Sequence, residues 1–108
     1  MLTENYIRCL KSKNREAYKV ALRQTLIYYL YREEISCTTI SALLGCTRRY
    51  VYTAIYGARD RMEVGDRLTI QAMEELKTHK IRVIPATADG GVMAKFIGYK
   101  MFIDNVIF

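Results

Sequence analysis

Apolar side chains in the first 80 residues recur every three or four positions, which is the spacing typical of helices. The longest such stretch runs from about Arg15 to Arg32. Its apolar positions at this spacing are Ala17, Val20, Ala21, Ile27, Tyr28 and Tyr31, and those that widen the stripe are Leu22, Leu26, Tyr29 and Leu30. We therefore expect a central helix that is buried on more than one side, preceded by a short helix after Thr3.

The next stretch, residues 34–57, predicts two capped helices joined by a tight turn. Ser36 is a favourable N-cap, and Gly45 is well suited to the left-handed conformation that ends a helix. Thr47 is a second N-cap, directly before a helix with inward apolar positions at Val51, Ala54, Ile55, Ala58 and Met62. Two such helices with a glycine in the connecting turn are typical of a helix-turn-helix.

A further helix and a β-rich segment follow. The helix runs from an N-cap at Asp66 to about His79, with apolar residues Leu68, Ile70, Ala72, Met73 and Leu76. After Lys80 the chain becomes rich in β-branched and aromatic residues. Residues 81–84 are β-like, Pro85 ends this strand or places it at a sheet edge, and residues 88–91 predict a turn. Residues 92–97 and 99–108 would complete a hairpin, with room for a third short strand.

These elements predict a mainly α fold, with a helix-turn-helix domain at residues 1–80 and a small β-hairpin at residues 81–108. The hairpin either belongs to the same compact unit or acts as an oligomerisation element. No apolar run approaches the roughly 18 residues that cross a bilayer, and the N-terminal sequence lacks a signal-peptide pattern. We expect a cytoplasmic protein with no membrane partner.

Little in the chain suggests catalysis. Cys9, Cys37 and Cys46 lack C-x-x-C spacing and His79 is the one histidine, so we expect buried thiols and no metal site. There is no phosphate-binding glycine loop and no Ser/His/Asp constellation. We expect no enzyme, no cofactor and no small-molecule substrate.

The positive charge is concentrated in one part of the chain. Residues 1–61 hold 11 Lys/Arg and 5 Asp/Glu, whereas residues 62–108 hold 6 of each, so the net charge of +6 belongs to the first part. This asymmetry indicates either a polyanionic partner or a solvated surface. The residues that we expect to contact a nucleic-acid backbone are Lys11, Lys13, Arg15, Lys19 and Arg23.

The helix after Thr47 carries the candidate base-reading side chains. With Val51 facing the core, helical periodicity places Arg49, Tyr52, Thr53 and Tyr56 on the opposite side, and Arg48 at its N-terminal edge. Residues in the first turns of a recognition helix read base edges in the major groove, and arginine pairs with both acceptors of guanine. We therefore expect double-stranded DNA binding, with Arg59 and Arg61 extending the positive surface. Alternatively, the tyrosines pack on the next helix and the arginines are solvated.

Residues from about 14 to 80 resemble the C-terminal DNA-binding domain of the bacterial replication initiator DnaA, which has a Trp-repressor-like fold. The matching segments are the basic loop Lys11-Ser12-Lys13-Asn14-Arg15, then Leu22-Arg23-Gln24 and Tyr29-Leu30-Tyr31-Arg32-Glu33, then Ser36 and Ile40-Ser41-Ala42-Leu43-Leu44-Gly45. The resemblance implies that the helix from Arg48 enters the major groove and that Arg23 reaches an adjacent minor groove. The family's G-R-D-H-T-T-V motif is replaced here by residues 46–51, so its DNA target sequence is not implied.

The ATPase domain of the initiator has no counterpart in these 108 residues. We therefore expect a small transcription or replication regulator of phage or mobile-element type. The apolar segment at residues 96–108 either packs on the helices or pairs with another chain, and we favour a homo-oligomer formed through residues 81–108. The alternative function is a protein–protein adaptor, for example a virion or assembly component.

Overall fold

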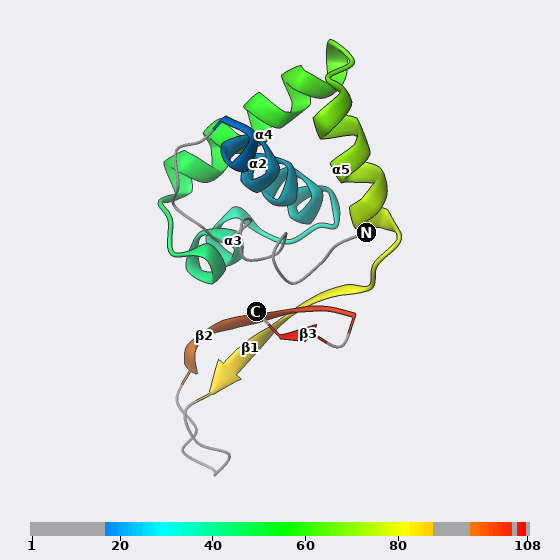
Figure 1. Cartoon of the computed structure of the whole chain (residues 1–108). Helices are drawn as coiled ribbons and strands as arrows, with labels where there is room; N and C mark the ends of the chain where they lie inside the picture. The colour runs from blue at the N-terminus through cyan, green and yellow to red at the C-terminus, as the bar shows by residue number, and fades with distance from the viewer. Residues whose placement is uncertain (1–16, 88–95, 105, 108) are drawn as a thin grey trace. The chain divides into compact units, whose positions relative to one another are not determined.

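The computed structural model describes residues 17–87, 96–104 and 106–107, and the chain divides into two compact units, Met1–Thr78 and His79–Phe108. The first unit contains four described helices (Figure 1): α2 (Ala17–Arg32), α3 (Cys37–Leu44), α4 (Arg48–Glu63) and α5 (Arg67–Lys77). The second contains β1 (Ile81–Thr87), β2 (Phe96–Ile103) and β3 (Val106–Ile107). The mainly helical fold with a small C-terminal β element is confirmed. The helix expected after Thr3 and the turn expected at residues 88–91 lie outside the described residues.

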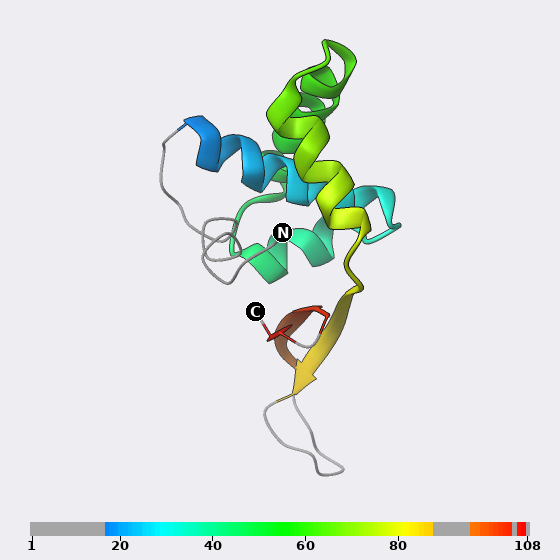
Figure 2. The same cartoon turned by 45° about the vertical axis from the view of Figure 1, so that its right-hand side comes forward.

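Helix α2 is the centre of the helical unit, as the sequence predicts, because it packs against α3, α4 and α5. Figure 2 shows α5 crossing one end of α2. The buried stripe differs from the expected one, since the leucines assigned to its margin form the centre of the core. Leu22, Leu26 and Leu30 are buried at four-residue spacing, whereas Tyr31 is 47% exposed. A helix that is apolar on most sides does not reveal from its sequence which side meets its neighbours.

The connection between α3 and α4 has the caps that the sequence predicts. The Ser36 side chain accepts a hydrogen bond from the Thr39 amide at 3.1 Å, and Thr47 accepts one from the Tyr50 amide at 3.0 Å. Gly45 ends α3 in the left-handed region, with φ of 66°, and its amide donates to the Ser41 carbonyl. Since these bonds satisfy backbone groups that a helix end leaves open, they fix where α4 begins. Helices α3 and α4 form the expected helix-turn-helix.

Helix α5 starts after Asp66, as expected, but its buried face includes a polar residue. Thr69 is fully buried, whereas Leu68, which the sequence assigned to packing, is 37% exposed. The Asp66 carboxylate accepts hydrogen bonds from the amide and the hydroxyl of Thr69, at 3.0 and 2.7 Å. The cap therefore satisfies the hydroxyl that burial of Thr69 removes from water.

The sheet unit is an antiparallel sheet with strand order β1-β2-β3, so β1 lies at an edge. Directly before β1, the Lys80 carbonyl faces β2, because it accepts a hydrogen bond from the Asp104 amide at 2.7 Å. Backbone groups alternate in direction along a strand, so those of Arg82 and Ile84 also face β2, and Pro85 turns its nitrogen outward. The strand continues through Pro85 to Thr87 because a proline there removes no bond to β2.

Gly98 lies inside β2, where the sequence suggested a division into two segments. Its φ is 139°, and the register shifts between Ala86 and Thr87, which pair with Gly98 and Phe96. The extra residue on β2 is Ile97, which makes this a β-bulge. Glycine tolerates the positive φ, so β2 bends at this point instead of ending.

Candidate nucleic-acid interface

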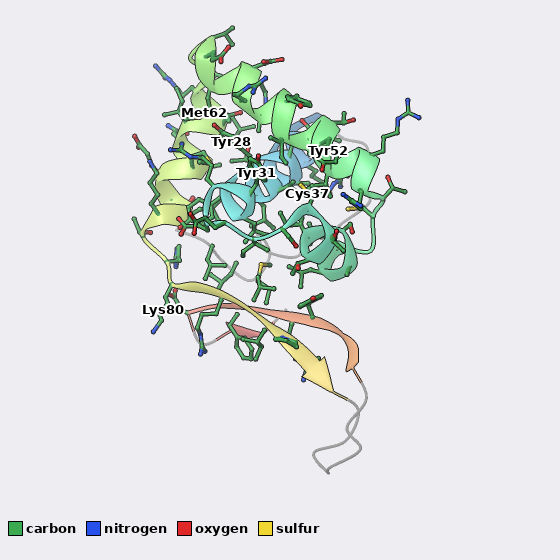
Figure 3. All side chains as sticks on the ribbon, turned by 180° about the vertical axis from the view of Figure 1, so that it is seen from behind. Tyr28, Tyr31, Cys37, Tyr52, Met62 and Lys80 are labelled. Carbon is green, nitrogen blue, oxygen red and sulfur yellow. The ribbon has the colours of Figure 1, made fainter. Side chains whose placement is uncertain are left out.

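Helix α4 has one apolar side and one polar side, in the orientation that its spacing predicts. Of the five residues expected to face the core, Val51, Ala54, Ile55 and Ala58 are buried, and Met62 is half-buried. The side chains on the other face are exposed: Arg48, Arg49, Tyr52, Thr53 and Tyr56. Tyr52 and Tyr56 are 42% and 52% exposed, so they are not covered by the neighbouring helices. Figure 3 shows Tyr52 on the outer side of α4. The five candidate base-reading residues thus share one accessible surface, named here the α4 outer face.

The first turn of α4 concentrates positive charge. Arg48 and Arg49 are its first two residues, and the first acidic residue of the helix is Asp60, twelve positions after Arg48. The N-terminal end of a helix carries a partial positive charge of its own, so two cations there are unfavourable for the isolated chain. The same arrangement favours an anion, because two exposed arginines lie at the end of the helix where its backbone amides point outward.

Two contacts fix side chains on the α4 outer face. The Thr53 hydroxyl donates to the Arg49 carbonyl at 3.1 Å. The hydroxyl hydrogen of Thr53 is therefore used within the helix, and its oxygen can still accept a hydrogen bond from a ligand. The Arg59 guanidinium lies over the Tyr56 ring, 4.9 Å from its centre. This cation–π contact holds a third positive charge above the outer face.

Arg61 does not extend this surface, contrary to the expectation from the sequence. It is half-buried, and its three nitrogens donate to groups on two other helices. On α5, the Thr69 hydroxyl accepts a hydrogen bond from Nε at 3.0 Å. On α2, the Gln24 side chain and the Ala21 carbonyl accept hydrogen bonds from the two terminal nitrogens, at 2.7 and 3.4 Å. Arg61 is therefore a structural residue that joins α4 to α2 and α5.

Burial and hydrogen bonding shift two pKa values in this network. Burial lowers the pKa of the Arg61 guanidinium, and the charge of Asp66 opposes that effect. The hydroxyl and amide of Thr69, which donate to Asp66, lower the pKa of its carboxyl. Arginine remains charged at neutral pH in spite of such a shift. The three side chains accordingly form a charged, hydrogen-bonded junction.

Gly57 allows α2 to approach α4 closely beside this junction. A Cβ at this position would lie 2.8 Å from Oε1 of Gln24, the atom that accepts from Arg61. A larger residue would therefore require the flexible end of the Gln24 side chain to shift. The sequence pattern contains no signal for this contact, because the glycine lies inside a helix and not in a turn.

The basic residues assigned to the nucleic-acid backbone are only partly described. Lys19 and Arg23 lie on α2 and are half-exposed. Lys11, Lys13 and Arg15 lie outside the described residues. The sequence also missed exposed aromatic surface on α2: Tyr31 is exposed, and Arg32 lies over the Tyr28 ring at 5.8 Å (Figure 3). Because both tyrosines fitted the predicted apolar stripe, nothing in the pattern marked them as accessible.

The described residues show no alternative chemical centre. Cys37 is buried, as expected, but Cys46 is half-buried in the turn before α4. Across residues 17–87, 96–104 and 106–107, no group of three or more His, Cys, Asp or Glu side chains could hold a metal ion. Within the same residues, no helix combines the length and the apolar character required to traverse a bilayer.

Comparisons with protein-family models, with curated proteins and with solved structures found no match for this chain.

Proposed function

We propose that the protein binds double-stranded DNA by inserting the N-terminal half of α4 into the major groove. The observation that carries this proposal is the first turn of α4, where Arg48 and Arg49 project from a capped helix whose opposite side is buried. A recognition helix needs this arrangement: a fixed N-terminus, an accessible outer side and side chains that can reach base edges. The major-groove assignment is also the one implied by the resemblance to the DnaA DNA-binding domain.

The side chains of the α4 outer face would have different roles. Arg49 would pair with the two acceptors of a guanine, a contact that contributes about 1–3 kcal/mol of discrimination. Thr53 would accept a hydrogen bond or touch a thymine methyl, since its donor is already used. Tyr52 and Tyr56 would contact sugar and phosphate groups, and Arg48 would hold a phosphate at the helix N-terminus.

Basic residues on and before α2 would hold the DNA backbone. Lys19 and Arg23 are the described members of this group, and Lys11, Lys13 and Arg15 complete it in the sequence. Arg23 would reach the minor groove beside the one that α4 occupies. Contacts of this kind position a protein on the duplex without reading its sequence.

The test begins with selection of a binding site from random duplexes, followed by competition between the selected and a scrambled duplex. Arg49→Ala should reduce the preference for the selected site by about 5- to 150-fold and retain most of the affinity for the scrambled duplex. Arg67→Ala is the matched control, because Arg67 is an exposed arginine at the first position of α5. An unchanged preference in the folded Arg49→Ala variant would refute the recognition-helix assignment.

The biological role proposed with this activity is transcription or replication regulation of phage or mobile-element type, exerted in the cytoplasm without catalysis. The second candidate is a protein–protein adaptor. It is favoured by the exposed tyrosines Tyr31, Tyr52 and Tyr56, because tyrosine and arginine are enriched at protein interfaces. Affinity measured against salt separates the two, since each phosphate contact on duplex DNA contributes about −0.9 to the slope of log K against log salt.

Self-association through the sheet unit is part of the proposal. The outward backbone groups of Ile81 and Val83 lie on the free edge of β1, which a second copy could extend as a sheet. A homodimer would present two copies of α4 to two half-sites. Sedimentation of the full chain should show an oligomer at tens of micromolar, and a monomer at that concentration would contradict this part.

A further inference from the structure

One side of the sheet forms a second basic surface, which shares no residue with the α4 outer face. Residues directly opposite each other in an antiparallel pair point to the same side, and side chains alternate along each strand. Arg82 pairs with Phe102 and Ile84 pairs with Lys100, so these four side chains share one side. Lys80 lies two positions before Arg82 and belongs to the same side; Figure 3 shows it at the start of β1.

This side of the sheet is basic and accessible. Lys80, Arg82 and Lys100 are all exposed. Among the described residues of His79–Phe108, Asp104 is the one acidic side chain. Its carboxylate is already held by His79 Nδ1 at 2.6 Å and by the Lys80 amide at 3.0 Å. These contacts lower the pKa of the carboxyl, with the His79 hydrogen bond contributing most. The carboxylate of the described sheet residues is thus engaged by His79 and by the Lys80 amide, and no ion pair joins it to Arg82 or Lys100.

An aromatic ring orients one of these cations. The Arg82 guanidinium lies over the Phe102 ring, 5.1 Å from its centre. The contact restricts the guanidinium of a side chain that remains exposed, so less entropy is lost when it meets an anion. Ile84, which is 40% exposed, adds apolar surface beside Lys100.

We propose that this sheet face, defined by Lys80, Arg82, Lys100 and Phe102, is a second nucleic-acid contact that binds the sugar-phosphate backbone. Alternate residues along a strand are about 7 Å apart, and a neighbouring strand lies about 5 Å away, so the three cations form a short positive strip. A phosphate backbone is a regular row of anions and complements such a strip without base contacts. A protein partner fits less well, because the central parts of protein interfaces are depleted of lysine.

The inference goes beyond the proposed role of α4 and is tested on the full chain. The variant is the double substitution R82Q/K100Q. The control R67Q/K77Q removes the same number of charges from exposed positions on α5. Fluorescence anisotropy with a labelled duplex, and with one of its strands, gives the slope of log affinity against log salt. R82Q/K100Q should reduce the magnitude of the slope by about 1.8 on the duplex or about 1.4 on the single strand, and the control by much less.

The two probes identify the form of nucleic acid that the sheet face binds. R82K/K100R keeps both charges and should retain the slope, which separates charge loss from local misfolding. An unchanged slope in R82Q/K100Q on both probes would overturn the sheet contact. If Arg49→Ala still lost site preference in that case, the α4 proposal would stand alone. Absence of binding by the unaltered protein to either probe at low salt would overturn both.

Discussion

Helix α4 carries arginines at both ends, and the two ends place the same side chain in opposite environments. Arg48 and Arg49 are exposed at its start, whereas Arg61 donates hydrogen bonds to Thr69, Gln24 and the backbone of α2 at its other end. The difference comes from the neighbouring helices, because the second end of α4 meets polar acceptors on α2 and α5. The arginines of α4 are therefore of two kinds, exposed ones at its start and a structural one near its end, and the sequence alone does not distinguish them.

The largest expected effect concerns Arg61, the arginine that joins α4 to α2 and α5. Arg61→Met should lower the free energy of unfolding by about 2–3 kcal/mol, because Gln24 and Thr69 lose a charged donor in a partly buried place. Urea denaturation followed by circular dichroism measures this loss. Arg49→Met is the control and should change stability by less than about 0.5 kcal/mol. Equal stability of the two variants would remove the distinction between the ends of α4.

Gly57→Ala should raise stability by less than the roughly 1 kcal/mol that alanine usually adds in a helix interior. The added Cβ would require the flexible end of the Gln24 side chain to shift, which weakens its hydrogen bond to Arg61. In a Gln24→Ala background this contact is absent, so the same substitution should be more stabilising. A double-mutant cycle by thermal or urea unfolding measures this difference, and additive effects would argue against the close approach.

The Asp66 cap predicts a smaller, pH-dependent effect. Hydrogen bonds from Thr69 lower the pKa of Asp66 in the folded state, so its contribution is present above the unfolded pKa. That contribution should be lost as the pH falls through the lowered folded value. Asp66→Asn retains a capping side chain and should flatten the dependence of stability on pH below about 4. Urea midpoints measured from pH 2 to 6 would show this, and parallel curves would contradict it.

The smallest effect concerns the other end of α4. Arg48→Gln and Arg49→Gln should each raise stability by about 0.3 kcal/mol at low salt, because a cation in the first helical turn opposes the helix dipole. The gain should disappear at high salt. Paired unfolding curves at two salt concentrations measure it. A loss of stability would show that these arginines have a structural role instead.

The caps of α3, α4 and α5 were predictable because their determinants are local. Ser36, Gly45, Thr47 and Asp66 act through backbone groups within a few residues of themselves, so their roles depend on nearby sequence. The orientation of α4 followed from Val51 and its helical repeats for the same reason. These signals were sufficient to place all five candidate base-reading residues on one exposed side.

The partners of each helix could not be predicted from local signals. Leu22, Leu26 and Leu30 displaced the tyrosines from the centre of the α2 stripe because three helices surround that side. Thr69 is buried and Leu68 is exposed since a hydroxyl at that point satisfies both Asp66 and Arg61. Which residue is buried at such a position depends on groups far away in the sequence. The spacing of apolar residues carries no information about those groups.

The sequence by itself determined the caps at which α3, α4 and α5 begin, the glycine at which α3 ends, which side of α4 is apolar, and that a β element follows. Capping and periodicity carry that information over a few residues. The tertiary structure decided that Arg61 is structural, that Gly57 permits close packing, and that Pro85 lies in an edge strand. It also brought Arg82 and Phe102 together across β1 and β2. Each of these outcomes depends on a partner at least eight residues away, since burial and strand pairing join groups that the chain order separates.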